Sequence, residues 1–189
     1  MKIKPYLTSD LKKLRRGPAI TLPKDFGIIV AYTGINKNSK IIEIGTGSGF
    51  LTVQFSRIAK KIITYEKRKD FADLSKNNFQ SLKLKNVKLL NVDAFEGIDE
   101  KDADLFMIDI HNAHEIVKIA FDSLKEGGYL AAHCLSVEQS KLLFLECKKI
   151  FKEVFMVETL VREYDVDELR TRPKHIGIIH TAYLLFARK

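Results

Sequence analysis

The chain has 189 residues, 46% of them hydrophobic, and a formal net charge of +8. This length predicts one domain with a substantial buried core. No stretch approaches the ~20 consecutive apolar residues of a membrane span, and residues 1–5 begin no long apolar run, so we expect neither a membrane anchor nor a secretory signal. The positive charge suits a polyanionic partner, although a lysine-rich solvated surface gives the same balance.

The two cysteines, Cys134 and Cys147, each lie in an apolar run, and their spacing matches no metal site. We interpret both as small buried hydrophobic residues. This use of cysteine predicts a reducing, cytoplasmic compartment and no bound metal.

Residues 1–22 form a basic lead-in, and residues 23–189 are expected to form the domain itself. The cations of the lead-in outnumber its single acid, Asp10; they are Lys2, Lys4, Lys12, Lys13, Arg15 and Arg16. An arm that contacts phosphate groups and a solvated strand that leads into the domain both fit this composition.

Beyond the lead-in, apolar runs alternate with helical patterns. A first helix is predicted from Pro23 to about Gly34, because proline is favoured in the first turn and glycine just past the end. Strands are then predicted at 40–44, 61–66, 87–91, 104–110 and 128–134, with helices near 48–60, 69–82, 112–125 and 136–151. A break is expected at Glu126–Gly128, before the last of these strands. Such alternation predicts an α/β fold, a parallel sheet with helices on both faces.

The C-terminal segment departs from this alternation. Strands are predicted at 153–163 and 176–187, whereas residues 163–173 are too polar and broken for another strand. Because no crossover helix separates the two strands, the last one is expected to run antiparallel within the sheet.

The stretch Ile41–Phe50 has the pattern of an apolar strand, a glycine turn and the start of a helix. Glycines at alternate positions permit positive φ and let a ligand lie close to the backbone, and N–H groups at a helix start suit an anion. A plain tight turn uses glycine in the same way. Two acids favour a ligand site: Glu43 precedes the glycines, and Glu66 ends the next strand about 20 residues further on.

Acids also follow the next two strands, Asp93 after the third and Asp109 after the fourth. Ligands of open parallel sheets bind beyond the carboxyl ends of the strands, so these side chains are expected at one edge. Glu66 is the predicted partner of ribose hydroxyls, and Asp93, with Ala94, of the exocyclic amine of an adenine. The alternative for Asp93 is a helix N-cap.

The G-x-G-x-G spacing behind Glu43 resembles the E/D-x-G-x-G-x-G signature of class I methyltransferases, which use S-adenosylmethionine (AdoMet). A dinucleotide site prefers G-x-G-x-x-G over a pyrophosphate, so we favour AdoMet. The resemblance implies a Rossmann-like fold, with a seven-stranded, mostly parallel sheet and an antiparallel last strand. The predicted AdoMet contacts are Glu43, Gly45, Thr46, Gly47, Ser48, Gly49, Glu66, Lys67, Asp93, Ala94 and Asp109.

Asp109 is the predicted catalytic residue, because it ends the most apolar strand and a carboxylate there faces the mouth of the expected site. It can stabilise positive charge that develops on an adenine ring and hold its amino group, or act as a general base. The structural alternative is an acid satisfied by N–H groups of the next helix. No Asn/Asp-Pro-Pro-Tyr/Phe motif, which clamps an amino group in many amino-methyltransferases, is present, and this favours another acceptor atom.

Four segments resemble the tRNA adenine-N1 methyltransferases that act on the T-loop adenine. They are Arg15–Asp25 (R-R-x-Q-I-x-Y-P-K-D in that family), Tyr65–Ala72 (Y-E-x-R-x-E-F-A), Asp93–Glu96 (D-A-x-E/D) and Arg172–Ala187 (R-P…H-T-A-Y-L-x-F-A). The last is the most specific, since a generic methyltransferase has no reason to share it. The resemblance implies tRNA, or another RNA, as substrate. Phosphate or substrate contacts are expected from Lys12, Lys13, Arg15, Arg16, Arg170, Arg172, Lys174 and His180, the last being equally suited to a structural role.

Two features depart from that family. Its members usually carry an extra N-terminal β domain, for which this chain has no room. They often show L-P/M-x-P-W after the strand-four aspartate, where this chain has Ile110-His111-Asn112-Ala113-His114. The two histidines fit a stacking surface or a proton carrier, although the start of a helix in a polar loop accounts for both. The family resemblance suggests a homo-oligomer, a dimer or a tetramer.

Other functions fit less of the sequence. A small-molecule methyltransferase of the corrin-pathway type has a similar length but shows a G-G-S/T-G-G loop after strand four, which Ile110-His111-Asn112 does not supply. A protein-repair methyltransferase would show motifs that are missing here. A non-catalytic binder fits the fold but not the full set of strand-end acids. We therefore predict AdoMet-dependent methylation of RNA, at adenine N1 of tRNA.

Overall fold

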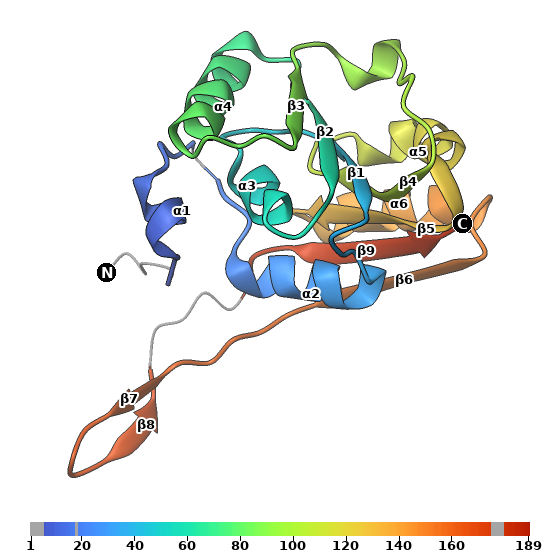
Figure 1. Ribbon diagram of the computed structural model, residues 1–189. Coiled ribbons are helices and arrows are strands. Elements are labelled where there is room, and N and C mark those ends of the chain that lie inside the picture. The colour runs from blue at the N-terminus through green and yellow to red at the C-terminus, as the bar shows by residue number, and fades with distance from the viewer. Residues whose placement is uncertain (1–5, 18, 175–179) are drawn as a thin grey trace.

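The strands form a seven-stranded sheet in the computed structural model, which describes residues 6–17, 19–174 and 180–189 (Figure 1). The strand order is β3-β2-β1-β4-β5-β9-β6. Neighbours among β1 to β5 run parallel, and β9 runs antiparallel to both β5 and β6. The predicted α/β fold with an antiparallel last strand is confirmed. The strands are β1 (Lys40–Ile44), β2 (Lys61–Tyr65), β3 (Val87–Leu90), β4 (Ala103–Ile108), β5 (Leu124–Cys134), β6 (Glu153–Glu158) and β9 (Tyr183–Arg188).

Helices cover both faces of this sheet. One core cluster joins Leu105 of β4 to Ile29 of α2 and Phe55 of α3. The other joins Phe106 of β4 to Leu143 of α6. Successive residues of β4 therefore enter opposite cores, as expected of a parallel strand that is buried on both faces. The helices are α2 (Pro23–Thr33), α3 (Phe50–Ser56), α4 (Lys69–Ser81), α5 (Val117–Ser123) and α6 (Val137–Lys148), with short 3₁₀ turns η1 (Ala94–Glu96) and η2 (Ala113–Ile116).

The basic lead-in contains a short packed helix, α1 (Ser9–Lys13). Its Leu11 and the following Leu14 are buried against Phe50 of α3 and Phe79 of α4. This part is therefore not the solvated strand that was one expectation, although Lys12, Lys13, Arg15 and Arg16 are exposed. The beginning of α2 at Pro23 and its end at Gly34, which has a φ of 64°, are confirmed. Pro18 and residues 1–5 lie outside the described residues, and the domain division at residue 22 stays a prediction.

The expected break at Glu126–Gly128 is wrong, because β5 begins at Leu124 and runs through both glycines. The strand stays paired with β4 by a shift in register between Ala103 and Leu105. A Cβ on Gly128 would come within 2.9 Å of the Ala103 carbonyl oxygen. Glycine therefore serves here to bring two strands close at an irregularity rather than to end a strand.

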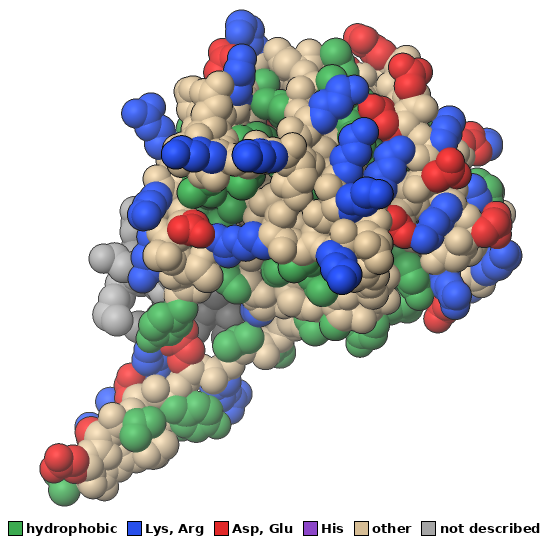
Figure 2. All heavy atoms as spheres, viewed as in Figure 1, with side chains coloured by type: hydrophobic (Ala, Val, Ile, Leu, Met, Phe, Trp, Pro, Cys, Tyr) green, Lys and Arg blue, Asp and Glu red, His purple; other side chains and the backbone are tan. Residues whose placement is uncertain are grey.

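The segment 163–173, expected to contain no strand, forms a hairpin of β7 (Tyr164–Val166) and β8 (Thr171–Pro173). We call this hairpin, residues 164–173, the arm. All residues of its two strands are exposed, so no apolar alternation marks them in the sequence. Figure 1 shows the arm extending away from the body, and Figure 2 shows hydrophobic, acidic and basic side chains together on it. The last strand, β9, begins at Tyr183, and residues 176–179 of the predicted strand lie outside the described residues.

A buried ion pair holds the base of the segment that carries the arm. The Lys24 ammonium lies 2.6 Å from Asp25 and donates to the hydroxyls of Thr159 and Thr181. Thr159 follows β6 and Thr181 precedes β9, so α2 joins the two ends of this segment. Among the described residues, no helix is long and apolar enough to cross a membrane.

Candidate active site

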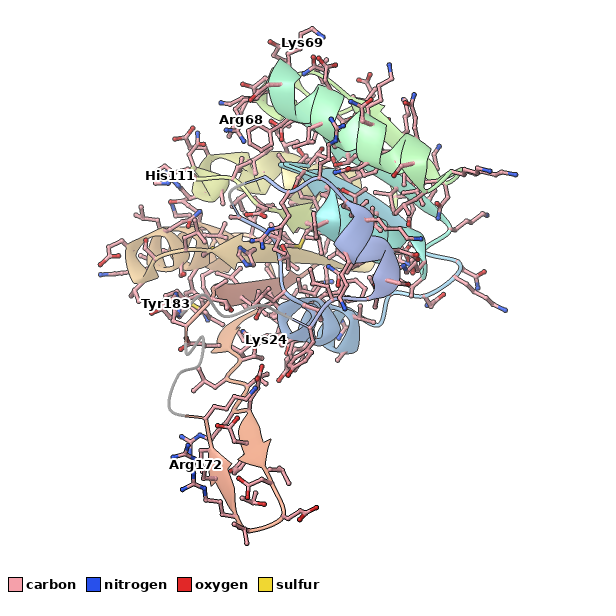
Figure 3. All side chains as sticks on the ribbon, turned by 90° about the vertical axis from the view of Figure 1, so that its left-hand side faces the viewer. Lys24, Arg68, Lys69, His111, Arg172 and Tyr183 are labelled. Carbon is pink, nitrogen blue, oxygen red and sulfur yellow. The ribbon has the colours of Figure 1, made fainter. Side chains whose placement is uncertain are left out.

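A cavity of about 500 Å³ opens at the carboxyl ends of β1, β2 and β4. Cavities of roughly 300–1,000 Å³ are typical of small-molecule sites. Most of the predicted ligand contacts line it: Gly45, Gly47, Ser48, Glu66, Lys67, Asp93, Ala94 and Asp109. Further lining residues include Tyr65, Arg68, Phe71, Ile110, His111, Asn112 and Leu135. The edge prediction made from strand ends thus holds, and Figure 3 shows Arg68 and His111 at this edge of the molecule.

Glu43, Thr46 and Gly49 do not line the cavity and shape the loop instead. Glu43 is only 1% exposed and accepts a hydrogen bond of 2.6 Å from the Thr52 hydroxyl. Burial raises the pKa of Glu43 to about 7, although the Thr52 hydrogen bond opposes the shift. The hydroxyls of Thr46 and Thr64 are hydrogen-bonded at 2.6 Å. Gly49 packs against Phe79, because a Cβ at this position would lie only 2.5 Å from the Phe79 ring.

The glycine loop meets the strand that carries Asp109. Gly45 has a φ of 91°, and a Cβ there would lie 2.2 Å from the Asp109 carbonyl oxygen. Gly47, with a φ of 55°, has nothing within 4 Å of the position of a Cβ. Only glycine adopts such backbone conformations without strain. The loop therefore offers bare main chain to a ligand, as the methionine end of AdoMet requires.

Glu66 is held in place by main-chain donors. One of its carboxylate oxygens accepts from the Gly47 N–H at 2.8 Å, and the other accepts from the Arg68 N–H at 3.0 Å. It is 5% exposed and lies at the wall of the cavity. A carboxylate fixed in this way can still accept from ribose hydroxyls with its remaining lone pairs.

Asp93 is the N-cap of η1 and also lines the cavity, and its contact with an adenine stays a prediction. One carboxylate oxygen accepts from the Phe95 N–H at 3.1 Å and caps η1, as the N-cap alternative predicts. The other oxygen lies 3.8 Å from the Lys67 ammonium. Because Asp93 also lines the cavity, capping fixes its position there without removing it from the site.

Asp109 follows β4, and its backbone N–H donates to the Ile44 carbonyl at 2.8 Å. Its side chain is 37% exposed and lines the cavity. His133, near the end of β5, lies with Nδ1 3.6 Å from the Asp109 carboxylate. His133 was not predicted from the sequence, because only the ends of the first four strands were considered. The signal was a lone polar residue in the apolar run Leu130-Ala-Ala-His-Cys134.

The side chain of Gln139, on α6, holds the loop after Asp109 by hydrogen bonds. Its amide nitrogen donates to the carbonyls of Ile110 and His111, at 2.8 and 2.9 Å, and its oxygen accepts from the Leu135 N–H at 2.9 Å. No sequence pattern pointed to Gln139. His114 lies in η2 beside Glu115, as the helix-start interpretation predicts, whereas His111 lines the cavity. The described residues contain no cluster of three His, Cys, Asp or Glu suited to a metal.

The predicted substrate residues divide into two groups. The Arg15 N–H donates to the Asn78 side chain, which in turn donates to the Ser48 carbonyl, so the exposed Arg15 and Arg16 lie beside the glycine loop. Arg172 lies on the arm, away from the cavity (Figure 3). His180 lies before β9 rather than within it, and its Nδ1 is 2.6 Å from Glu158. The structure therefore does not bring Arg172 or His180 to the cavity.

Comparison with known proteins first defines the class. The family model described as Protein-L-isoaspartate(D-aspartate) O-methyltransferase (PCMT) matches residues 1–160, so the chain is an AdoMet-dependent methyltransferase of this class. A solved SAM-dependent O-methyltransferase from Thermotoga maritima has a TM-score of 0.90 at 29% identity, over 96% of this chain and 71% of the other. AdoMet is therefore its methyl donor. The protein-repair class is closer in sequence than its missing motifs suggested.

Relatives that match almost the whole chain show which family of methyltransferases it belongs to. The chain is 30% identical to the tRNA (adenine(57)-N(1)/adenine(58)-N(1))-methyltransferase TrmI of Methanocaldococcus jannaschii, over 98% of this chain and 77% of that protein. The chain belongs to the TrmI family. The solved tRNA (m1A58) methyltransferase TrmI of Aquifex aeolicus has a TM-score of 0.89 at 29% identity, covering 98% and 76% of the two chains. A probable cobalt-precorrin-6B C(15)-methyltransferase of Sulfurisphaera tokodaii is 31% identical over only 53% of this chain and 55% of its own.

Proposed function

We propose that this chain transfers a methyl group from AdoMet to N1 of an adenine in tRNA. The single observation that carries the proposal is that Asp109 lines the cavity, where we propose that its carboxylate faces the acceptor. A carboxylate there repels an anionic acceptor, such as the carboxylate that an isoaspartyl methyltransferase uses. It favours a neutral acceptor that becomes positive, which is the behaviour of adenine N1. Similarity to TrmI over 98% of the chain supports the same substrate.

The proposed reaction needs no proton removal. Bound AdoMet supplies a methyl group on a positively charged sulfur. The N1 lone pair forms the new bond as the sulfur–methyl bond breaks, and the positive charge passes to the adenine ring. Asp109 accepts a hydrogen bond from the exocyclic amino group and stabilises this charge in a partly buried site, where electrostatic interactions are stronger than in water.

The cofactor is proposed to lie along the predicted contacts. Its methionine end follows the loop from Gly45 to Ser48, its ribose hydroxyls donate to Glu66, and its adenine lies toward Asp93 and Ala94. Glu66→Gln should lower AdoMet affinity by about 10-fold, because each hydrogen bond to a charged group contributes roughly 1.5–3 kcal/mol. Titration calorimetry with AdoMet measures this, and Glu96→Gln, on the exposed side of η1, is the matched control. Equal affinities for both variants would contradict this placement.

RNA is proposed to approach over the basic lead-in. Asn78 ties the backbone of Arg15 to the glycine loop, and the exposed side chains of Arg15 and Arg16 are the proposed phosphate contacts beside it. Figure 2 shows further Lys and Arg side chains spread over the body. Phosphate contacts release counterions, so binding should weaken steeply with salt. A tRNA substrate also agrees with the expected cytoplasmic compartment, and the expected dimer or tetramer stays a prediction.

The test is incubation with AdoMet and an unmodified tRNA transcript, followed by mass spectrometry of the nucleosides. N1-methyladenosine is the expected product, and the modification should stop reverse transcriptase because N1 lies on the Watson–Crick edge. Transcripts with guanine in place of adenine 57, adenine 58 or both locate the position. An isoaspartyl peptide and a corrinoid precursor are parallel acceptors. Methylation of either of these, with none in tRNA, would refute the proposal and identify the protein-repair or the corrin-type alternative.

A further inference from the structure

Asp109 and His133 are neighbours at the ends of two paired strands. β4 and β5 are in register so that Ile108 faces Ala132, and the next residue of each strand is Asp109 and His133. Alternation along β5 places His133 on the same face as Ala131, which packs in the core cluster with α2. The strand pairing thus brings a histidine to the carboxylate that faces the acceptor.

The His133 ring has an unusual environment for a buried polar group. The residue is 9% exposed, and within residues 6–17, 19–174 and 180–189 its Nδ1 has no hydrogen-bond partner. The Asp109 carboxylate lies 3.6 Å from this nitrogen, which is an ion-pair distance and longer than a hydrogen bond. A buried polar atom without a partner is destabilising, because it has lost its hydrogen bonds to water. Such an atom, directed at a cavity carboxylate, indicates a functional constraint.

The charged groups around His133 come from two elements. Asp109 ends β4, and α2 contributes Asp25 and Lys24, which form a close pair with each other. On β9 the residue paired with His133 is the uncharged Leu184. Burial and the charge of Lys24 lower the pKa of His133, but Asp109, with a smaller contribution from Asp25, outweighs them and raises the pKa above its usual 6.5. Asp109 is therefore the group to which the His133 ring responds most strongly.

We propose that His133 is a positioning residue for Asp109, holding one carboxylate oxygen so that the other meets the amino group of the acceptor adenine. This role rests on the proposed methylation of adenine N1. Hydrogen bonds of catalytic groups are often long in the ligand-free state and shorten when substrate binds, so the 3.6 Å contact is compatible with it. When His133 is neutral, the full negative charge of Asp109 faces the adenine ring. When His133 is protonated, its positive charge cancels the charge of Asp109.

Methyl transfer should therefore accelerate as pH rises through the pKa of His133. The kinetic test measures single-turnover tRNA methylation from pH 6 to pH 9 in two variants. His133→Leu, which lacks a donor, should lower the transfer rate by about 10- to 100-fold, the effect typical of losing a side chain that orients a ligand. His133→Asn keeps a donor but cannot be protonated in this range, so it should recover most of the rate and lose the pH dependence. His114→Gln, away from the cavity, is the histidine control.

A wild-type rate and pH profile in His133→Leu would overturn the proposal, and so would an unchanged pH dependence in His133→Asn. AdoMet affinity and melting temperature show whether each variant is folded. A second measurement needs no acceptor: NMR titration of the His133 ring in the unmodified chain and in Asp109→Asn. The pKa should fall in the variant, because burial then acts with little opposition. A pKa that stays the same would overturn the pairing even if tRNA is methylated, whereas failure to methylate tRNA would refute only the proposed function.

Discussion

At the cavity and the loop that supports it, Glu66 and Glu43 are at most 5% exposed and each accepts hydrogen bonds from defined donors, whereas all residues of β7 and β8 in the arm are exposed. The cavity is thus fixed by the packing of the sheet. The arm is held by its own strand pairing and by the Lys24–Asp25 network at its base. The difference indicates that changes in the cavity should affect chemistry and stability, while changes at the tip of the arm should affect neither.

The largest effect is expected at Asp109, the proposed catalytic residue. Asp109→Ala should lower the methyl-transfer rate by about 10³-fold, because it removes a preorganised charge from a partly buried site. AdoMet affinity should change by less than about 3-fold, since Glu66 and the glycine loop are untouched. Initial-rate assays with tRNA and calorimetry with AdoMet measure the two quantities. Asp122→Ala, exposed on α5, is the matched control, and full activity of Asp109→Ala would eliminate this role.

The next effect concerns the base of the arm. Asp25→Ala should lower the free energy of unfolding by about 3–5 kcal/mol, because it leaves the Lys24 ammonium in a buried site without its counter-charge. Asp25 is fully buried and also accepts from Thr159 and Thr181. Urea denaturation followed by circular dichroism measures the change, with Asp122→Ala again as control. A loss below about 1 kcal/mol, the range of exposed ion pairs, would show that the network is not structural.

A smaller, pH-dependent effect is expected at Glu43. With a pKa of about 7 in the folded chain and 4.5 otherwise, the folded state holds a proton that the unfolded state releases between these values. Stability from this group is therefore present at low pH and is lost as pH rises through 7. At pH 8 the cost reaches about 3 kcal/mol at most. Glu43→Gln should remove this dependence, so melting temperatures at pH 5 and pH 8 should differ less in the variant; an equal difference would contradict the buried acid.

The smallest effect is expected at the tip of the arm. Leu169 is 96% exposed, so Leu169→Ser should change the free energy of unfolding by no more than about 0.5 kcal/mol. AdoMet affinity should also be unchanged, because the arm does not line the cavity. Thermal unfolding and calorimetry test both points. A destabilisation of several kcal/mol would mean that Leu169 is covered in the protein as it exists in solution.

The sequence predicted which edge of the sheet carries the site, because hydrophobic runs and the acids that follow them are local signals. Glu66 and Asp109 follow the buried strands β2 and β4, Asp93 follows the edge strand β3, and the topology rule alone then brings the three acids together. The arm was missed because exposed strands carry no apolar alternation. His133 was missed because its role depends on the register of β4 against β5, and register is set by the whole sheet.

Glu43 shows the limit of a motif. The signature correctly indicated the cofactor, but the structure turns this side chain inward to Thr52, where it supports the loop rather than the cavity. His180 belongs to the segment that most resembles the family, yet its ring contacts Glu158 near the base of the arm and does not line the cavity. A motif identifies a fold and its ligand; which of its side chains touches the ligand depends on packing that lies elsewhere in the chain.

The glycine loop after β1 and the segment after β4 meet at Asp109. The Asp109 N–H donates to the Ile44 carbonyl, and Gly45 approaches the Asp109 carbonyl closely. Displacement of the reacting groups by about 1 Å is enough to slow such transfers 100-fold. Because these contacts join β1 directly to the segment that follows β4, an engineered change of acceptor should preserve them and alter the loop from Ile110 to Asn112 instead.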